Sequence, residues 1–121
     1  MPREGVVLAV VWQFDVQVGS EEEFEKLHGA DGAWTALSRR SRSFLGSSFL
    51  KDLATPGRYL LLEYWSEMMV YEKHLADFSD HVEELKSQRT AMVRETVPLG
   101  IFDALDVPER HSPTWSVRDG R

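Results

Sequence analysis

Large apolar residues recur at every second position near the start of this chain, over residues 6–14. The positions between them carry smaller apolar residues that give way to polar ones. Successive side chains of a strand point to opposite faces of a sheet, so this pattern predicts a strand whose large face lies under helices. The other face includes Val7, Ala9 and Val11, so it is still apolar and needs a second partner.

A second alternating run covers residues 58–65. Its two faces carry Leu60, Leu62 and Tyr64 on one side and Tyr59, Leu61, Glu63 and Trp65 on the other. Thr55-Pro56-Gly57 predicts a tight turn before it, since proline fixes φ and glycine accepts a positive φ. We therefore expect residues 43–52 and 58–65 to form a hairpin.

Helical spacing of apolar residues fills the long segment between the first strand and this hairpin. Ser20 and Glu23 predict a capping box, in which the serine hydroxyl accepts from a first-turn amide and the glutamate bonds back. The run Gly29-Ala30-Asp31-Gly32 interrupts this helix. A second helical piece then carries Trp34 and ends near Arg40.

The segment after the hairpin is also helical. Ser66 is the expected N-cap of this second helix. We expect a kink or restart at residues 77–80, where Asp80 repeats the capping pattern. The stripe that continues from there consists of Val82, Leu85, Arg89 and Met92.

A last strand is expected at residues 94–105, where Pro98 and Gly100 favour a bulge or a sheet edge. The resulting order is β-α-β-β-α-β, which predicts an α+β, ferredoxin-like fold with an antiparallel sheet. Helices cover one face of such a sheet and leave the other bare. Soluble monomers rarely expose so large an apolar face, so we expect two copies to pair as a dimeric α+β barrel. The alternative is that the C-terminal tail covers this face.

Composition and charge narrow the class of partner. The 121 residues suit one domain at 1–105, followed by a tail at 106–121 in which Trp115 is the expected anchor. A net charge of −6 argues against nucleic-acid binding, and the lack of cysteine excludes disulfides and thiolate chemistry. The apolar run at 6–11 is too short for a signal peptide or a membrane span. We therefore expect a soluble, cytoplasmic protein.

The basic cluster Arg39-Arg40-Ser41-Arg42 lies at the expected end of the first helical segment. It either interacts favourably with the helix dipole or forms an anion-binding or substrate-entrance site. Metal binding has little support, because His74 and His81 are two helical turns apart, about 10 Å along the axis. No Gly-rich phosphate loop or serine elbow is present. We expect no metal and no cofactor.

Taken together, residues 6–105 resemble the antibiotic biosynthesis monooxygenase superfamily, the dimeric α+β barrels. The matching features are Phe24, Gly32-Ala33-Trp34, Leu37, Phe44-Leu45-Gly46, Pro56-Gly57-Arg58-Tyr59, Glu63-Tyr64-Trp65-Ser66, Tyr71 and Leu99-Gly100-Ile101-Phe102. The resemblance implies a pocket between the helices and one sheet face. It also implies, as in some members, oxygenation of a polyketide anthrone to a quinone without metal or flavin. In those members the deprotonated substrate itself donates electrons to oxygen.

Another branch of the same superfamily binds and degrades haem. That branch uses an asparagine on the first strand, and this chain contains no asparagine. Counted from Trp65, the helix tryptophan of that branch falls at His74 and its haem-ligating histidine falls at Glu84. All three positions depart from the pattern, which disfavours haem degradation.

His74 is the candidate catalytic residue, because an imidazole titrates near neutrality and can accept a proton from a phenol or an enol. The alternative is a half-buried core histidine. The candidate substrate-binding residues, which equally suit a core, are His28, Trp34, Tyr64, Trp65 and Tyr71. A lone carboxylate is unlikely to be buried unpaired, so we expect Glu63 to form a structural pair with Arg58 or with an arginine of a partner chain.

The sequence is compatible with two functions. The first is a cofactor-independent monooxygenase acting on a planar aromatic or polyketide-type substrate. The second is a non-enzymatic barrel that binds a small hydrophobic molecule or serves as an accessory protein. A pocket that binds an oxygen-reactive phenol has the same residues in either case.

Overall fold

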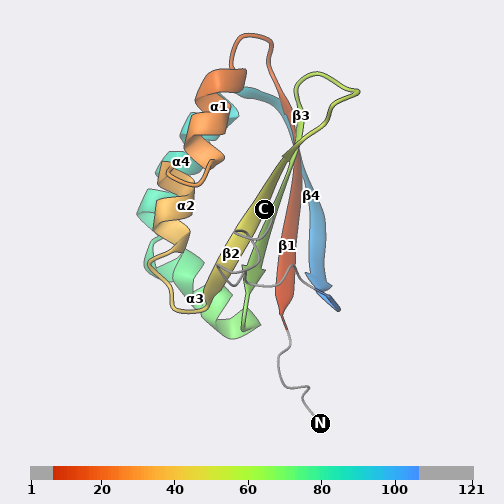
Figure 1. Cartoon of the computed structure of the whole chain (residues 1–121). Coiled ribbons are helices and arrows are strands. Elements are labelled where there is room, and N and C mark those ends of the chain that lie inside the picture. Colours follow the sequence, from red (N-terminus) through yellow and green to blue (C-terminus); the bar gives the residue numbers. More distant parts are fainter. Residues whose placement is uncertain (1–6, 107–121) are drawn as a thin grey trace, which may run out of the picture.

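The computed structural model describes residues 7–106, which form a four-stranded antiparallel sheet with helices packed on one face (Figure 1). The elements are β1 (Leu8–Val16), α1 (Glu21–His28), α2 (Ala33–Ser38), β2 (Phe44–Lys51), β3 (Arg58–Trp65), α3 (Met68–Asp77), α4 (Ser79–Thr90) and β4 (Val93–Asp103). This order confirms the α+β, ferredoxin-like class. The expected tail and Trp115 lie outside the described residues.

The strands are arranged in the order β2-β3-β1-β4, so β1 and β3 are central and β2 and β4 form the edges. The hairpin turns at Gly57, whose φ of +86° only glycine adopts readily. The expected irregularity in the last strand is also present. Val11 pairs with Gly100 while the next residue, Trp12, pairs with Pro98, so one extra residue bulges from β4.

The core lies between the helices and one face of the sheet. Its central residues come from β1 and β3, where Phe14, Val16, Tyr59, Leu61 and Trp65 are each no more than 1% exposed. The expectation that the even face of β1 lies under helices is therefore confirmed. It ends at Val16, because Val18 lies beyond the strand and is 91% exposed. Burial of an apolar side chain of this size contributes about 1.5–3 kcal/mol to folding.

The helix N-termini differ from the expected capping pattern. Ser20 is the N-cap of α1 but makes no side-chain capping bond, and Glu21 instead accepts from the Gly19 amide at 2.9 Å. The N-cap of α3 is Glu67 rather than Ser66. The hydroxyl of Ser43, just before β2, accepts from the Ser66 and Glu67 amides at 3.2 Å each. A residue distant in sequence thus satisfies these donors.

The restart between the two later helices is confirmed, since α3 ends at Asp77 and α4 begins at Ser79. Asp80 is not its cap. Phe78 occupies that position with no side-chain capping bond, and Asp80 lies inside the first turn of α4. Because Phe78 adopts a φ of −113° and a ψ of 29°, the helical path breaks at this one residue.

The other face of the sheet carries no helix (Figure 1). We call it the helix-free face. It is formed by the alternate residues of each strand, among them Val11, Leu50, Leu60, Leu62, Tyr64 and Phe102. Leu50 and Phe102 are 49% and 50% exposed. The described chain therefore presents an apolar sheet face to its surroundings.

Candidate functional site

His74 lies on the side of α3 that faces the sheet, within a set of aromatic side chains. Its ring is centred 5.3 Å from Trp65 and 5.1 Å from Phe78. Trp65 in turn contacts Tyr71 at 4.9 Å and Phe44 at 5.3 Å. We call these five residues the His74 cluster. The structure thus brings together three of the candidate residues, namely His74, Trp65 and Tyr71.

The imidazole of His74 is only 6% exposed, and its Nδ1 has no hydrogen-bond partner among the described residues. Burial lowers the pKa of His74, Asp77 raises it and the positive charge of Arg40 lowers it, with burial as the largest effect. A histidine with a lowered pKa is neutral at pH 7. It can therefore accept a proton from an acidic carbon or hydroxyl group placed beside it.

Tyr71 supplies a second polar group to the His74 cluster. Burial raises the pKa of its phenol, and the negative charges of Glu63 and Glu72 raise it further. Tyr71 therefore stays protonated over the physiological range and can donate a hydrogen bond to a carbonyl or an oxyanion. Tyr71 and His74 both contact Trp65, so one hydrogen-bond donor and one proton acceptor lie beside its indole ring.

The buried carboxyl group of Glu63 is bonded to the indole nitrogen of Trp65. Glu63 is 2% exposed, and its Oε2 accepts from Trp34 Nε1 at 2.7 Å and from Ser38 Oγ at 3.2 Å. Its Oε1 accepts from Trp65 Nε1 at 3.3 Å. The carboxyl group therefore holds both tryptophan rings, because an indole nitrogen can only donate.

Arg89, and not Arg58, supplies the positive charge that faces Glu63. Arg58 instead pairs with Asp52 at 3.6 Å, so the expected Glu63–Arg58 pair is wrong. The pKa of Glu63 is raised, because the effect of burial exceeds the opposite effects of its three hydrogen bonds and of Arg89. Burial lowers the pKa of Arg89 to about 10, which leaves it charged at pH 7. The guanidinium lies over the rings of Phe14 and Trp34, 4.9 and 4.8 Å from their centroids.

One feature of the sequence indicates that Arg89 is a core residue, namely its position in the apolar stripe of α4. A basic residue at helical spacing from Val82 and Leu85 must either project beyond the core or be buried with a partner. It is 6% exposed. Without the tertiary structure, nothing linked that position to Glu63, which lies on a different element.

His28 is the second buried histidine, but it belongs to a separate part of the core. It is 1% exposed and packs against Phe14, Phe24 and Trp34, with ring centres 5.4, 4.9 and 5.5 Å away. Neither ring nitrogen has a hydrogen-bond partner among the described residues. Trp34 therefore touches His28 on one side and bonds to Glu63 on the other.

The protonation of His28 predicts a dependence of stability on pH. Burial, followed by the charge of Arg89, lowers the pKa of His28 from 6.5 to about 3. The unfolded chain then binds more protons than the folded one between these values, so stability is present above pH 6.5 and is lost as the pH falls. The loss from pH 7 to pH 5 should be about 2 kcal/mol.

Urea unfolding at pH 7 and pH 5 measures this loss, with His28→Leu as the variant and His81→Leu, at an exposed position, as the control. The His28 variant should lose less stability than the wild type over this range. An equal loss in both proteins would show that His28 is not the group responsible.

Tyr64 is not part of either cluster. It projects to the helix-free face, where its hydroxyl lies 3.3 Å from the Ser48 hydroxyl. The alternation of residues along β3 correctly predicts that Tyr64 and Trp65 lie on opposite faces of the sheet. Only the position of the helices shows which face Tyr64 occupies.

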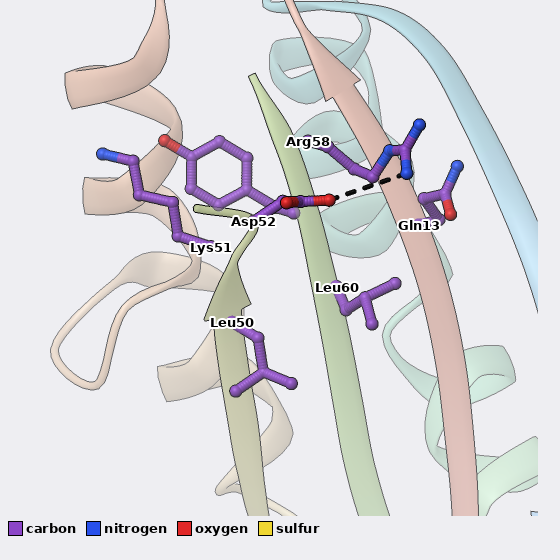
Figure 2. A pocket seen from close by; sticks show the side chains of 7 residues that line it. Gln13, Leu50, Lys51, Asp52, Arg58 and Leu60 are labelled. Carbon is purple, nitrogen blue, oxygen red and sulfur yellow. Dashed lines mark ion pairs between the residues drawn. The ribbon is translucent and has the colours of Figure 1, made fainter. Parts of the chain in front are cut away.

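Two pockets lie at the other end of the molecule, near the β2–β3 hairpin. The first has a volume of about 240 Å³ and is lined by Gln13, Leu50, Lys51, Asp52, Arg58, Tyr59 and Leu60 (Figure 2). The second, of about 310 Å³, is lined by Glu25, Phe49, Leu50, Lys51 and Tyr59. Lys51 pairs with Glu25 at 2.9 Å, and Arg58 with Asp52, so both cations are already neutralised. None of the residues of the His74 cluster lines either pocket.

Metal ligands are not gathered in the part of the chain that the structure describes, since no three His, Asp or Glu side chains there are placed to hold an ion. Within the same residues, every helix falls short of the length and apolar character needed to cross a bilayer.

This α+β fold with a four-stranded antiparallel sheet is shared with solved structures assigned as antibiotic biosynthesis monooxygenases. A scan of family models finds no match, and a search of curated proteins finds none either. The similarity is to solved structures, and it confirms at the level of the fold the resemblance that the sequence motifs indicated.

One similar structure is SnoaB, a cofactor-independent oxygenase from Streptomyces nogalater, with a TM-score of 0.63 and 23% identity over 87% of this chain and 100% of that one. A protein from Nitrosomonas europaea, provisionally assigned as an antibiotic biosynthesis monooxygenase, has a TM-score of 0.67 and 15% identity over 90% and 100% of the two chains. A similarly assigned protein from Caulobacter crescentus has a TM-score of 0.65 and 19% identity over 84% and 92%.

Proposed function

We propose that this protein is a cofactor-independent monooxygenase that acts on a planar aromatic or polyketide-type substrate at the His74 cluster. The observation that carries the proposal is a neutral, buried imidazole with an unpartnered Nδ1, set beside Trp65 and Tyr71. The fold shared with a cofactor-independent oxygenase supports the same reaction class. At these identities, the likeness itself extends only to the fold.

The chemistry needs a base and a means of orienting the substrate. His74 accepts a proton from the CH₂ group of an anthrone-like ring, which leaves a carbanion delocalised over the ring system. The carbanion gives one electron to dioxygen, and the resulting radical and superoxide combine to form a peroxide. Loss of water then leaves a carbonyl group, so that one CH₂ group and one O₂ become one C=O and one H₂O.

The protein contributes orientation and proton handling to this scheme. In the proposal, the Trp65 indole provides a flat wall for the substrate, and Tyr71 donates to the oxyanion of the deprotonated ring. Glu63 keeps the Trp65 ring in place from behind. Trp34 and His28 lie further into the core, where their contacts are to Glu63 and to aromatic side chains.

A homodimer formed through the helix-free face is part of the proposal. That face holds Leu60 and Leu62 on the central strand β3 and Phe102 on the edge strand β4, and a monomer of this size rarely leaves such a surface exposed. A second copy of the same face is self-complementary and closes the two sheets into one barrel. Tyr64 would then lie between the two subunits.

His74→Gln should lower the rate of oxygen uptake by about 10²- to 10⁴-fold, the usual contribution of a positioned general base. Glutamine fills similar space but does not accept a proton at neutral pH. The measurement is oxygen consumption by purified, metal-stripped protein against a panel of anthrones and hydroquinones. Circular dichroism should show an unchanged fold.

His81→Gln is the matched control, because His81 is an exposed histidine on α4. Full activity in a folded His74 variant would remove His74 from the mechanism. Binding of the same compounds without any oxygen uptake would favour the alternative function, a barrel that holds a small aromatic molecule without converting it.

A further inference from the structure

Arg40 is exposed and contacts Phe78, a member of the His74 cluster. It follows the end of α2, and its guanidinium carbon is 4.6 Å from the ring centroid of Phe78. Phe78 is the single residue between α3 and α4, and its ring also lies 5.1 Å from that of His74. The loop after α2 is thereby joined to the α3–α4 break (Figure 1). Phe78 therefore lies in contact with both the Arg40 guanidinium and the His74 imidazole.

The charge of Arg40 is not neutralised by any residue that the structure describes. Five other basic residues of the described chain are bound to carboxylates, namely Lys51, Arg58, Lys73, Lys86 and Arg94. Arg40 has an aromatic ring as its partner instead. This cation is therefore free to bind an acid from outside, in a chain whose net charge is −6.

The two nearby arginines, Arg39 and Arg42, make different contacts from those of Arg40. Arg39 donates to the carbonyl oxygen of Ala30 at 2.9 Å, so it holds the loop before α2. Arg42 is exposed and has no ring contact among the described residues. An interaction with the dipole of α2 explains little, because this helix has only six residues and the Arg40 side chain packs on Phe78.

We propose that Arg40 is the recognition residue for an acidic substituent of the substrate, so that the ligand of the His74 cluster is an aromatic carboxylate. This inference rests on the proposed function and names the class of substrate for the same site. A guanidinium that stacks on a ring keeps the N–H groups at its edge in its own plane, where they match both oxygens of a carboxylate. The aromatic part of the ligand would then reach past Phe78 toward His74 and Trp65.

The positive charge of Arg40 already acts on this site, since it is one of the groups that lower the pKa of His74. The same field stabilises an anion that approaches the imidazole. An aromatic ligand without a charge gains nothing from this contact. Arg40 should therefore separate acidic ligands from neutral ligands of the same shape.

Binding can be measured without turnover by quenching of tryptophan fluorescence, because Trp65 lies inside the His74 cluster. The probes are an anthraquinone carboxylic acid and its methyl ester, both already oxidised and so unable to react. The acid should bind the wild type more tightly than the ester does. In Arg40→Gln, its affinity should fall about 10- to 100-fold, the usual cost of a lost charge-assisted contact, while the ester is unaffected.

Arg42→Gln is the matched control and should leave both affinities unchanged. Arg40→Lys should restore part of the preference for the acid, because the charge remains and the planar fork is lost. Equal binding of acid and ester to the wild type, or an equal loss of both in Arg40→Gln, would overturn the inference while the proposed function stands. If neither compound binds and no anthrone supports oxygen uptake, both fail together.

Discussion

Replacing Glu63 by alanine should lower the free energy of unfolding by about 3–5 kcal/mol, because three buried donors lose their acceptor and the buried guanidinium of Arg89 loses the carboxyl group that acts on it. Arg89 is 6% exposed, and its Nη1 already has no hydrogen-bond partner among the described residues. The change also leaves the indole nitrogens of Trp34 and Trp65 without an acceptor. Each of these losses is costly in a site that water does not reach.

Urea unfolding at pH 7 measures this effect, and Glu84→Ala is the control, since Glu84 is an exposed glutamate on α4. Glu63→Gln should fall between the two, because its amide oxygen keeps one acceptor while the charge is lost. The double change Glu63→Leu with Arg89→Met should recover much of the stability, as apolar replacements of buried ion pairs often do. A loss below about 1 kcal/mol for Glu63→Ala would mean that Arg89 leaves the core readily.

Placing a charge in the middle of the helix-free face should separate the proposed dimer. In Leu62→Lys, the new ammonium group lies on the central strand β3, where pairing of two sheets would bury it without a partner. We expect the dimer to weaken by at least about 100-fold, because a buried unpaired charge costs several kcal/mol.

Sedimentation velocity over a range of concentrations measures the change, and wild-type protein should sediment as a dimer. Ser87→Lys adds the same charge at an exposed position of α4 and should leave the dimer intact. Wild-type protein that is monomeric at every concentration would contradict the proposal. A Leu62 variant that remains a dimer would move the interface to another surface.

The elements whose residues alternate strictly could be predicted closely. β3 was expected at residues 58–65 and has those bounds, since four buried and four less buried side chains alternate along it. The turn before it was equally clear, because Gly57 takes a positive φ. The ends of β1 and β4 shifted by one or two residues, since neighbouring strands decide where pairing stops.

The helix caps could not be predicted from local sequence. Ser66 stands where an N-cap is expected, yet the N-cap is Glu67, and the Ser43 hydroxyl accepts from the Ser66 and Glu67 amides just before α3. A local capping pattern shows only that a suitable hydroxyl is present. Any other hydroxyl that the fold brings to the same amides competes with it.

The candidate site was also predictable only in part. The sequence placed His74 on the inward side of a helix, and the ring is indeed buried against Trp65. It did not show that Arg89 faces Glu63 or that Arg40 reaches Phe78, because the residues of each pair come from different elements. It also did not show that Tyr64 is separated from the other candidates by the sheet itself.

The sequence by itself determined the fold class, the order of the elements and the two faces of each central strand. These properties follow from periodicity and turn chemistry, which act over a few neighbouring residues. Only the tertiary structure decided which charge acts on Glu63, which hydroxyl accepts from the amides before α3 and which aromatic rings surround His74. Those contacts depend on how helices from distant parts of the chain pack onto the sheet, and local sequence does not encode the partner that packing brings into reach.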